Sequence, residues 1–392
     1  MPRRFAAAVL LLLAGCAAVR RPPTTPAALL AQGDGAGADY RAAVDTLVAR
    51  LADRAARRGD RTLDVLLLSG GGQNGAYGAG FLRGWAERGD APLPLPRFDL
   101  VTGISTGALQ GAFALLGTRA ALDTMSALYR NAADAFAPKL DWLFWLRRTG
   151  GVVRTDAYAR TIRDVVDPDM RGALEAAFLE GRQYAVATAD LDLGTGRLWD
   201  VRRELAVGPG GAERLHAVLY AATAIPGVFP PRLIDGHVHA DGGVAGNLLP
   251  VLGLDDYRAL GRALRARGVA GDVTVRTWVV VNFWTHAPPR AVDPSRRNQV
   301  SGRANLMMLW AHQADQVARL HELARAVTAD VPGLRLEVRH TAIPVALSMD
   351  PAASRLFDRA FMARLDSAGF ARGRAGDAWD PVPTPYARPA AP

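Results

Sequence analysis

The sequence holds a single cysteine and a single lysine. Because Cys16 is the only cysteine in 392 residues, no disulfide can form within the chain. Lys139 is the only lysine, so the net charge of +9 rests almost wholly on arginine. These arginines are scattered among 38 acidic residues instead of forming one basic stripe. The composition therefore argues against nucleic-acid binding and favours a basic surface near anionic lipid headgroups.

The N-terminus has an apolar stretch, residues 5–13, that is too short to span a bilayer. It follows two arginines and ends in Leu13-Ala14-Gly15-Cys16, which resembles a bacterial lipobox. The resemblance implies a signal peptide over residues 1–15, cleavage before Cys16 and attachment of lipid to that cysteine. Ala17, rather than aspartate, comes next. By resemblance to lipoprotein sorting, this favours the outer membrane.

We therefore expect a lipid-anchored protein of a bacterial cell envelope. Residues 16–39, rich in proline, alanine, threonine and glycine, are typical of a flexible tether. A helix over residues 40–58 then leads into one principal domain, residues 40–375, and residues 376–392 form a proline-rich tail.

Strand and helix patterns alternate along the domain, as an α/β fold requires. With 49% hydrophobic residues, the chain can bury a large core. Strands are expected at 63–68, 98–101, 183–188, 273–283 and 334–339, and helices at 76–87, 108–116, 120–136, 213–222, 305–327 and 354–368.

The most informative motif is Gly103-Ile104-Ser105-Thr106-Gly107. A strand-like run precedes it and a helix-like run follows, so Ser105 is predicted on a sharp turn that exposes its hydroxyl. A Cβ at Gly103 or Gly107 would crowd neighbouring backbone in such a turn. Alone, this Gly-x-Ser-x-Gly motif is a weak signal, because an ordinary helix N-cap has the same pattern.

A glycine-rich loop, Ser69-Gly70-Gly71-Gly72-Gln73-Asn74-Gly75, follows the first apolar strand. Its backbone N–H groups can converge on one anion at the start of a helix. The loop also satisfies the Gly-x-Gly-x-x-Gly pattern of dinucleotide-binding folds, which need an acidic residue at the end of the next strand. Here that strand ends in the Ser105 turn instead. We therefore interpret the loop as donors for an oxyanion.

A third segment, His239-Ala240-Asp241-Gly242-Gly243, places a carboxylate beside two glycines, where the chain can turn sharply. Acyl transfer requires a nucleophile, a base within hydrogen-bond reach and preorganised donors for the oxyanion. Ser105, Asp241 and the glycine loop are the candidates for these three parts.

Taken in order, four segments resemble the patatin-like phospholipase family. They are residues 68–77, residues 103–107, residues 221–231, and Asp241-Gly242-Gly243 with Asn247 and Pro250. The likeness covers residues 64–250 and extends more loosely to a helix near 357–370. It implies a three-layer α/β/α fold, a modified α/β-hydrolase sheet with helices on both faces, and lipid acyl hydrolysis of phospholipase A type.

The resemblance also assigns roles. Ser105 is the nucleophile and Asp241 is its general base, in a dyad without a catalytic histidine. The N–H groups around Gly70, Gly71 and Gly72 form the oxyanion hole.

Two positions depart from the family's pattern. Asn74 stands where the family commonly carries lysine or arginine, which removes a fixed positive charge from beside the loop but leaves the backbone donors. Thr223 replaces the usual serine, a milder change.

Without the resemblance, the chemistry favours a Ser-His-Asp triad, because aspartate alone is a poor base for an alcohol. In α/β-hydrolase order the histidine follows the aspartate. The candidates are His286, His312, His321 and His340, of which His340, at the end of a predicted strand, is the best placed. Each of them is more commonly a structural or surface residue.

Two further clusters need an interpretation. Asp190 and Asp192 could suggest a metal, but the sequence shows no accompanying ligand cluster and they are typical of a turn before Gly194, so we expect no metal or other cofactor. Asp141 to Arg148 groups two tryptophans, a phenylalanine and two leucines before a basic pair. This segment is either a packed core corner or a patch that docks on lipid.

The sequence therefore predicts a lipid-anchored serine acyl hydrolase acting on phospholipid or another acyl ester, without nucleic acid as a partner. Two alternatives stay open at this point. One is a triad esterase that uses a late histidine. The other is a non-catalytic lipoprotein that keeps a hydrolase shell and binds lipid or protein.

Overall fold

The computed structural model describes residues 24–89, 93–131, 139–147, 149–355, 357–376 and 378–386. Cys16, the expected signal peptide and Arg148 lie outside these residues. Among the described residues, no helix is both long and apolar enough to cross a membrane.

One mixed eight-stranded sheet forms the centre of the molecule, with the strand order β10-β9-β1-β2-β5-β8-β7 and with β6 paired to β5. β10, β9, β1, β2 and β5 pair with one another in parallel. β5 also pairs antiparallel with β6 and with β8, and β8 pairs antiparallel with β7. The strands are β1 (Thr62–Leu68), β2 (Leu100–Gly103), β5 (Gln183–Asp190), β6 (Thr195–Asp200), β7 (Arg232–Ile234), β8 (His237–Asp241), β9 (Val273–Val281) and β10 (Leu334–Ala342). A separate two-stranded hairpin pairs β3 (Lys139–Leu140) with β4 (Val153–Arg154).

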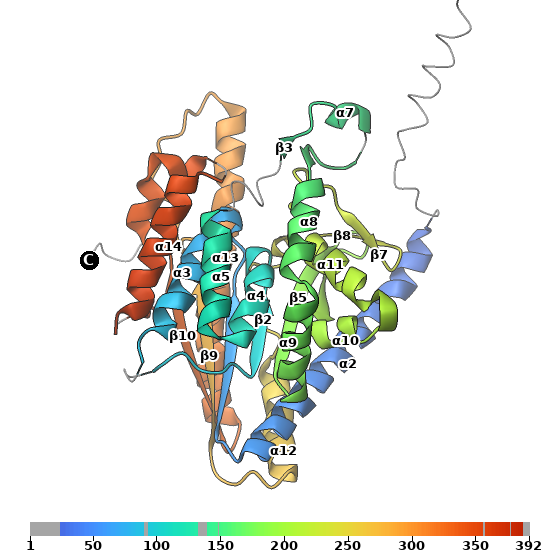
Figure 1. The fold of residues 1–392 in the computed structure, drawn as a ribbon, viewed down its shortest axis with the longest axis vertical. Helices are drawn as coiled ribbons and strands as arrows, with labels where there is room; N and C mark the ends of the chain where they lie inside the picture. The colour runs from blue at the N-terminus through green and yellow to red at the C-terminus, as the bar shows by residue number, and fades with distance from the viewer. Residues whose placement is uncertain are drawn as a thin grey trace, which may run out of the picture.

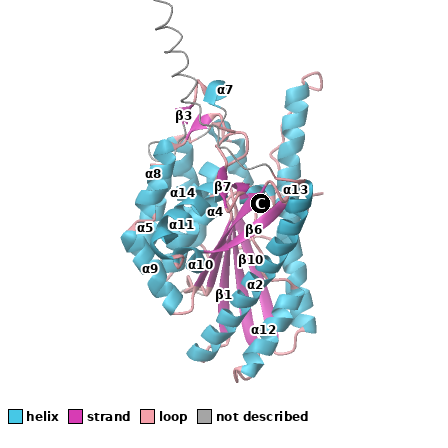
Figure 2. Cartoon of the chain, turned by 90° about the vertical axis from the view of Figure 1, so that its right-hand side faces the viewer, coloured by secondary structure: helices cyan, strands magenta, loops and turns pink. Residues whose placement is uncertain are grey.

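Helices cover both faces of the sheet (Figures 1 and 2). In Figure 2 the helices α2, α12 and α13 lie on one side of the sheet, and α5, α8, α9, α11 and α14 lie on the other. The main helices are α2 (Pro26–Arg58), α3 (Gly75–Ala86), α4 (Thr106–Leu116), α5 (Arg119–Arg130), α8 (Asp156–Val165), α9 (Pro168–Leu179), α10 (Val201–Leu205), α11 (Gly211–Ala222), α12 (Leu254–Ala266), α13 (Arg297–Asp330) and α14 (Arg359–Arg374). This arrangement confirms the three-layer α/β/α fold.

The parallel strands are continuous runs of apolar residues because both faces of the sheet are buried. In β1, Leu66 and Leu68 pack into the core beneath α3 and α4, whereas Leu63, Val65 and Leu67 pack into the core beneath α2, α12 and α13. Successive side chains of a strand point to opposite faces, so one run of leucine and valine supplies both cores.

Around β5 the sheet brings two strands end to end. Residues 183–186 of β5 pair with β2, residues 188–190 pair with β8, and β6 overlaps both stretches. Because a strand has only two edges, β2 and β8 lie along the same edge. β2 is parallel to β5 and β8 is antiparallel to it, so the carboxyl ends of β2 and β8 face each other. The residues that follow these two ends therefore meet.

Several boundaries differ from the sequence prediction. The flexible tether expected over residues 16–39 is wrong from Pro26 onward, because α2 begins there under a Thr25 cap and continues to Arg58. α13 begins at Arg297, earlier than expected, and α14 begins at Arg359, later than expected. The helix expected over 120–136 ends at Arg130.

The C-terminal tail also differs from expectation. Ala378 is fully buried, and the Trp379 ring lies 5.0 Å from the Trp278 ring and 5.2 Å from the Trp85 ring. Burial of the large apolar surface of the indole offsets the conformational entropy lost when this segment is ordered. The domain therefore extends past residue 376.

Candidate functional site

Ser105 lies on the sharp, strained turn that the sequence predicts, but the residue is buried rather than exposed. Ser105 lies between β2 and α4 with φ 51° and ψ −122°, a conformation that costs a non-glycine residue on the order of 1–3 kcal/mol. A Cβ on Gly103 would overlap the backbone of Gly107, and a Cβ on Gly107 would overlap the carbonyl of Leu68. Both glycines of the motif are therefore required by close packing.

Ser105 and Asp241 form a direct hydrogen bond. The hydroxyl of Ser105 donates to Oδ2 of Asp241 at 2.6 Å, and both residues are buried. The other carboxylate oxygen, Oδ1, accepts the Gly243 N–H at 2.8 Å, which fixes the orientation of the carboxylate. A Cβ on Gly242 would overlap the carbonyl of Ala187, so the Asp-Gly-Gly motif is also held by close packing.

Burial raises the pKa of Asp241 to about 6, against the opposing effect of the hydrogen bonds from Ser105 and Gly243. A carboxylate with this pKa is ionised at neutral pH and is a stronger base than an exposed aspartate.

The glycine loop lies against Ser105. A Cβ on Gly70 would meet Oδ1 of Asn247 and would come within 3.1 Å of the Ser105 Cβ. The Gly70 N–H already donates to the Asn247 carbonyl at 3.3 Å. Gly71 and Gly72 begin a 3₁₀ turn, η1 (Gly72–Asn74), whose first N–H groups have no partner within the turn. Of these two glycines, Gly72 lines the same cavity as Ser105.

A buried polar network holds this loop from behind. Asn282 donates its backbone N–H to Oγ of Ser69 and its side-chain amide to the Ser69 carbonyl and to Gln110. Asn247 bonds Gln313 of α13. The sequence analysis missed Asn282, Gln110 and Gln313. Asn282 had a signal: it is a polar residue directly after an apolar parallel strand, the position that Ser69 also occupies.

Asn74 is buried, and its side-chain oxygen has no hydrogen-bond partner among the described residues. Thr223 has a clear structural role, since its hydroxyl accepts from Tyr158 at 2.6 Å and bonds backbone carbonyls of α11. Tyr158 lies near Asp241, and burial raises its pKa.

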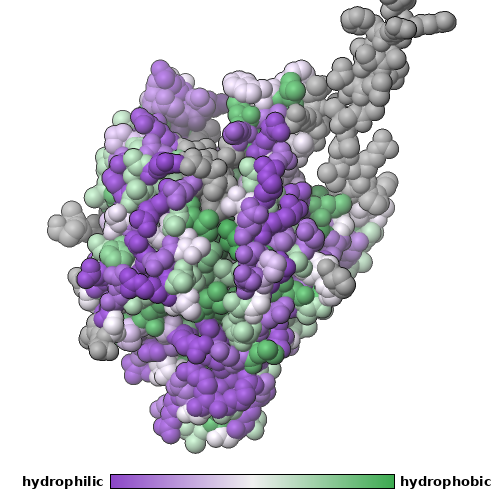
Figure 3. Space-filling view, in the orientation of Figure 1, coloured by the Kyte–Doolittle hydropathy of each residue, from purple (hydrophilic) through white to green (hydrophobic). Residues whose placement is uncertain are grey.

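An apolar cavity opens at Ser105. Its walls come from α4, α5 and α8 and from the segments around Thr223 and Phe229, with Gly72 at the rim. Figure 3 shows apolar side chains gathered in the strip between the hydrophilic outer faces of α5 and α8. The main apolar lining residues are Leu109, Phe113, Leu128, Ile162, Val165, Val228 and Phe229.

None of the described residues that line this cavity is a histidine. His340 lies within β10, where it bonds His321 at 3.2 Å, and burial lowers its pKa to about 4. His286 contacts the Thr384 carbonyl at 2.6 Å. The structure does not bring these histidines to Ser105, whose hydroxyl bonds the carboxylate directly.

Asp190 and Asp192 gain a third neighbour that the sequence analysis did not connect with them. His237 follows 45 residues after Asp192 and its Nδ1 lies 3.0 Å from Oδ2 of Asp190. Potential ligand atoms of these three residues lie within 4.8 Å of one another. Oδ1 of Asp190 accepts two turn N–H groups, as expected for a turn residue. The contact between Oδ2 of Asp190 and Nδ1 of His237 is an ion pair only when the imidazole is protonated.

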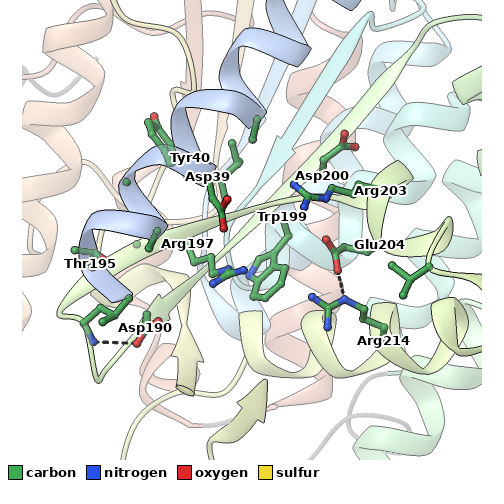
Figure 4. Close-up of a pocket in the computed structure, with 18 residues that line it drawn as sticks. Asp39, Tyr40, Asp190, Thr195, Arg197, Trp199, Asp200, Arg203, Glu204 and Arg214 are labelled. Carbon is green, nitrogen blue, oxygen red and sulfur yellow. Dashed lines mark hydrogen bonds and ion pairs between the residues drawn. The ribbon is translucent and has the colours of Figure 1, made fainter. Parts of the chain in front are cut away.

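A second cavity of about 480 Å³ lies between α2 and the β5–β6 hairpin (Figure 4). Here the Arg197 guanidinium points toward the Trp199 ring, 4.6 Å from its centre, and Glu204 bonds Arg214. Asp200 bonds Arg50. The lining contains neither Ser105 nor Asp241, so this cavity is separate from the candidate active site.

Comparison with known proteins places the site within a family segment. The family model of patatin-like phospholipases matches residues 66–255, a range that includes Ser105 and Asp241. The sequence matches none of the curated proteins. Among solved structures, VipD from Legionella pneumophila is similar at 11% sequence identity and a TM-score of 0.33. That alignment covers 80% of this chain and 66% of VipD, just under two thirds of its length.

Proposed function

We propose that this protein is a serine acyl hydrolase that cleaves acyl esters of phospholipids or related lipids through a Ser105–Asp241 dyad. The observation that carries the proposal is the 2.6 Å hydrogen bond between the two side chains, beside an apolar cavity that Ser105 lines. The match to patatin-like phospholipases supports lipid acyl hydrolysis in general.

In the proposed reaction, Asp241 accepts the hydroxyl proton while Oγ of Ser105 forms a bond to the ester carbonyl carbon. The tetrahedral intermediate collapses, the alcohol leaves with the proton held by Asp241, and the acyl group stays on Ser105. A water molecule then gives its proton to Asp241 and attacks the acyl enzyme. The acid is released, and the proton returns to Ser105.

The negative charge of the tetrahedral intermediate needs preorganised donors. We assign this role to the N–H groups of Gly71 and Gly72, because that of Gly70 donates to Asn247. The sequence predicted Gly70, Gly71 and Gly72 for the oxyanion hole, and the proposal leaves out Gly70.

The acyl chain lies in the apolar cavity. The cavity extends from Ser105 along α4 toward Ile162 and Val165 of α8, so a chain bound there is removed from water along its length. Its lining is almost entirely apolar, which favours a long hydrocarbon chain over a polar acyl group.

We also propose that Cys16 carries lipid and anchors the protein in a bacterial cell envelope, at the outer membrane. The support is the Leu13-Ala14-Gly15-Cys16 sequence with Ala17 after it. An anchor of this kind keeps a lipid hydrolase close to its substrate.

An active-site-directed fluorophosphonate tests the proposed function. The probe bonds covalently to an activated serine, so it should label the native protein at Ser105 and should leave Ser105→Ala unlabelled. A non-catalytic shell would give no labelling of the native protein. Release of fatty acid from defined lipid classes by the native protein then identifies the substrate.

A further inference from the structure

Two prongs that each expose some large apolar side chains extend beyond the sheet, at the end where the carboxyl ends of the parallel strands lie. One is the β3–β4 hairpin with α7 (Phe144–Arg147), and the other is the first part of α13. Both reach the same end of the molecule in Figures 1 and 2.

The first prong exposes large apolar side chains. Trp142 is 81% exposed and Trp145 is 66% exposed, and Leu140, Leu143 and Phe144 are also exposed. The sequence left two interpretations of residues 141–148, a packed core corner or a patch that docks on lipid. The exposure of these side chains contradicts the packed core corner. An exposed group of this size calls for a partner surface.

This prong is built on a fixed base. Asp141 is buried, its N–H donates to the Val152 carbonyl at 2.9 Å, and its carboxylate accepts the Leu143 N–H. The N–H groups of Val152 and Val153 both donate to the carbonyl of Val228, which lines the cavity at Ser105. The aromatic tip is thus joined directly to the cavity wall.

The second prong combines apolar and cationic groups. Val300, Leu306, Met307 and Met308 of α13 are exposed. Arg290 and Arg297 are exposed beside them, and among the described residues no acidic partner is found for either side chain. Further along α13, Gln313 bonds Asn247, whose carbonyl holds Gly70. Each prong is therefore linked to a different part of the candidate active site.

We propose that these two prongs form one docking surface for an anionic lipid bilayer, at the end of the sheet where Ser105 follows β2. The inference deepens the proposed function, on which it rests, by stating how a bilayer lipid reaches Ser105. Tryptophan favours the headgroup level of a bilayer, and unpaired arginine attracts anionic headgroups. Two separate prongs suit a deformable bilayer, whereas stable protein partners bury one continuous patch of about 800 Å² on each side.

Quenching of indole fluorescence by vesicle lipid tests this docking. The full chain carries Cys16→Ser, which prevents lipidation, and Ser105→Ala, which keeps the vesicles intact. The vesicles contain phosphatidylcholine and phosphatidylglycerol with brominated acyl chains, which quench nearby indoles. The parent should be quenched. Trp142→Phe with Trp145→Phe should remain bound to the vesicles and lose most of the quenching.

Reporter tryptophans then map the surface in that double-phenylalanine background. Val300→Trp should restore quenching. Leu179→Trp is the matched control, because Leu179 is 81% exposed, as Trp142 is, but ends α9 just before β5 begins at the opposite end of the sheet. It should give no quenching. Binding should fall on vesicles of phosphatidylcholine alone.

Equal quenching at positions 179 and 300 would overturn the proposed orientation. Absence of vesicle binding by the parent would overturn a lipid partner and assign the prongs to a protein. Neither result bears on the dyad, because hydrolysis of a soluble short-chain ester by protein with Ser105 intact tests the proposed function separately.

Discussion

Ser105 and Asp241 are 136 residues apart in the chain, and their side chains are 2.6 Å apart in the fold. The relationship follows from β5, since β2 and β8 lie end to end along one of its edges. The contact brings together the end of a parallel strand and the end of an antiparallel one, and it supports the first prediction.

Ser105→Ala and Asp241→Asn should each reduce kcat for ester hydrolysis by about 10⁴-fold or more, because both residues act in one unit. The double variant should be about as inactive as either single variant. His340→Ala should retain activity. Near-normal turnover by Asp241→Asn, or loss of turnover by His340→Ala, would replace the dyad with a triad. Circular dichroism checks that each variant is folded.

Activity should fall with pH through the pKa of Asp241. The aspartate accepts a proton only when ionised, so kcat/KM should decrease below about pH 6, the value to which burial raises this pKa. The measurement is the pH profile of kcat/KM on a soluble ester. A profile that stays flat down to pH 4 would contradict the assignment of the base.

The same pKa shift predicts an effect on stability. The folded state binds the Asp241 proton more tightly than the unfolded state, so stability from this group is lost as pH rises from 3.8 to about 6. At pH 8, Asp241→Asn should raise the free energy of unfolding by up to about 3 kcal/mol, at about 1.36 kcal/mol per pKa unit. Below pH 4 the advantage should disappear. Denaturant unfolding at the two pH values measures it.

The glycine loop offers a matched pair of variants. A Cβ on Gly71 would overlap the backbone carbonyl of Asn282, whereas a Cβ on Gly72 meets nothing within 4 Å. Gly71→Ala should shift the proposed oxyanion donors and reduce kcat by at least ~100-fold. Gly72→Ala, at φ 56°, should lower the free energy of unfolding by roughly 1 kcal/mol. It should reduce kcat less than Gly71→Ala does. Equal reductions of kcat in Gly71→Ala and Gly72→Ala would argue against the idea that a shift of the glycine loop impairs catalysis.

Replacing Cys16 with serine should leave the protein without lipid. The variant should then move to the soluble fraction or accumulate as uncleaved precursor, because several acyl chains are needed for stable attachment. Fractionation with mass spectrometry of the N-terminus measures both outcomes. Unchanged membrane attachment would contradict the lipobox interpretation.

Trp142→Ser with Trp145→Ser should slow hydrolysis of vesicle lipid several-fold, while a soluble short ester is cleaved at the normal rate. Leu179→Ser should change neither rate. Equal loss on both substrates would show that the tryptophans act on the site itself rather than on docking.

Local patterns predicted the parts of the molecule that depend on neighbours in the chain. The Ser105 turn, the glycine loop and the parallel strands were found because apolar runs and glycines mark them directly. The pairing of β8 with β5 was not predicted, because β8 has only the five residues His237–Asp241 and its partner strand is distant in the sequence. Trp379 was misjudged for a similar reason: prolines around it resemble a loose tail, but its indole packs on Trp85 and Trp278, far away in sequence.

The end-to-end meeting of β2 and β8 also sets the order in which the protein can become active. During synthesis the chain emerges from its N-terminus, and Ser105 appears long before Asp241. A nascent chain that ends before residue 237 holds the serine without its base. The proposed dyad is therefore incomplete until β8 has been made and has docked on β5.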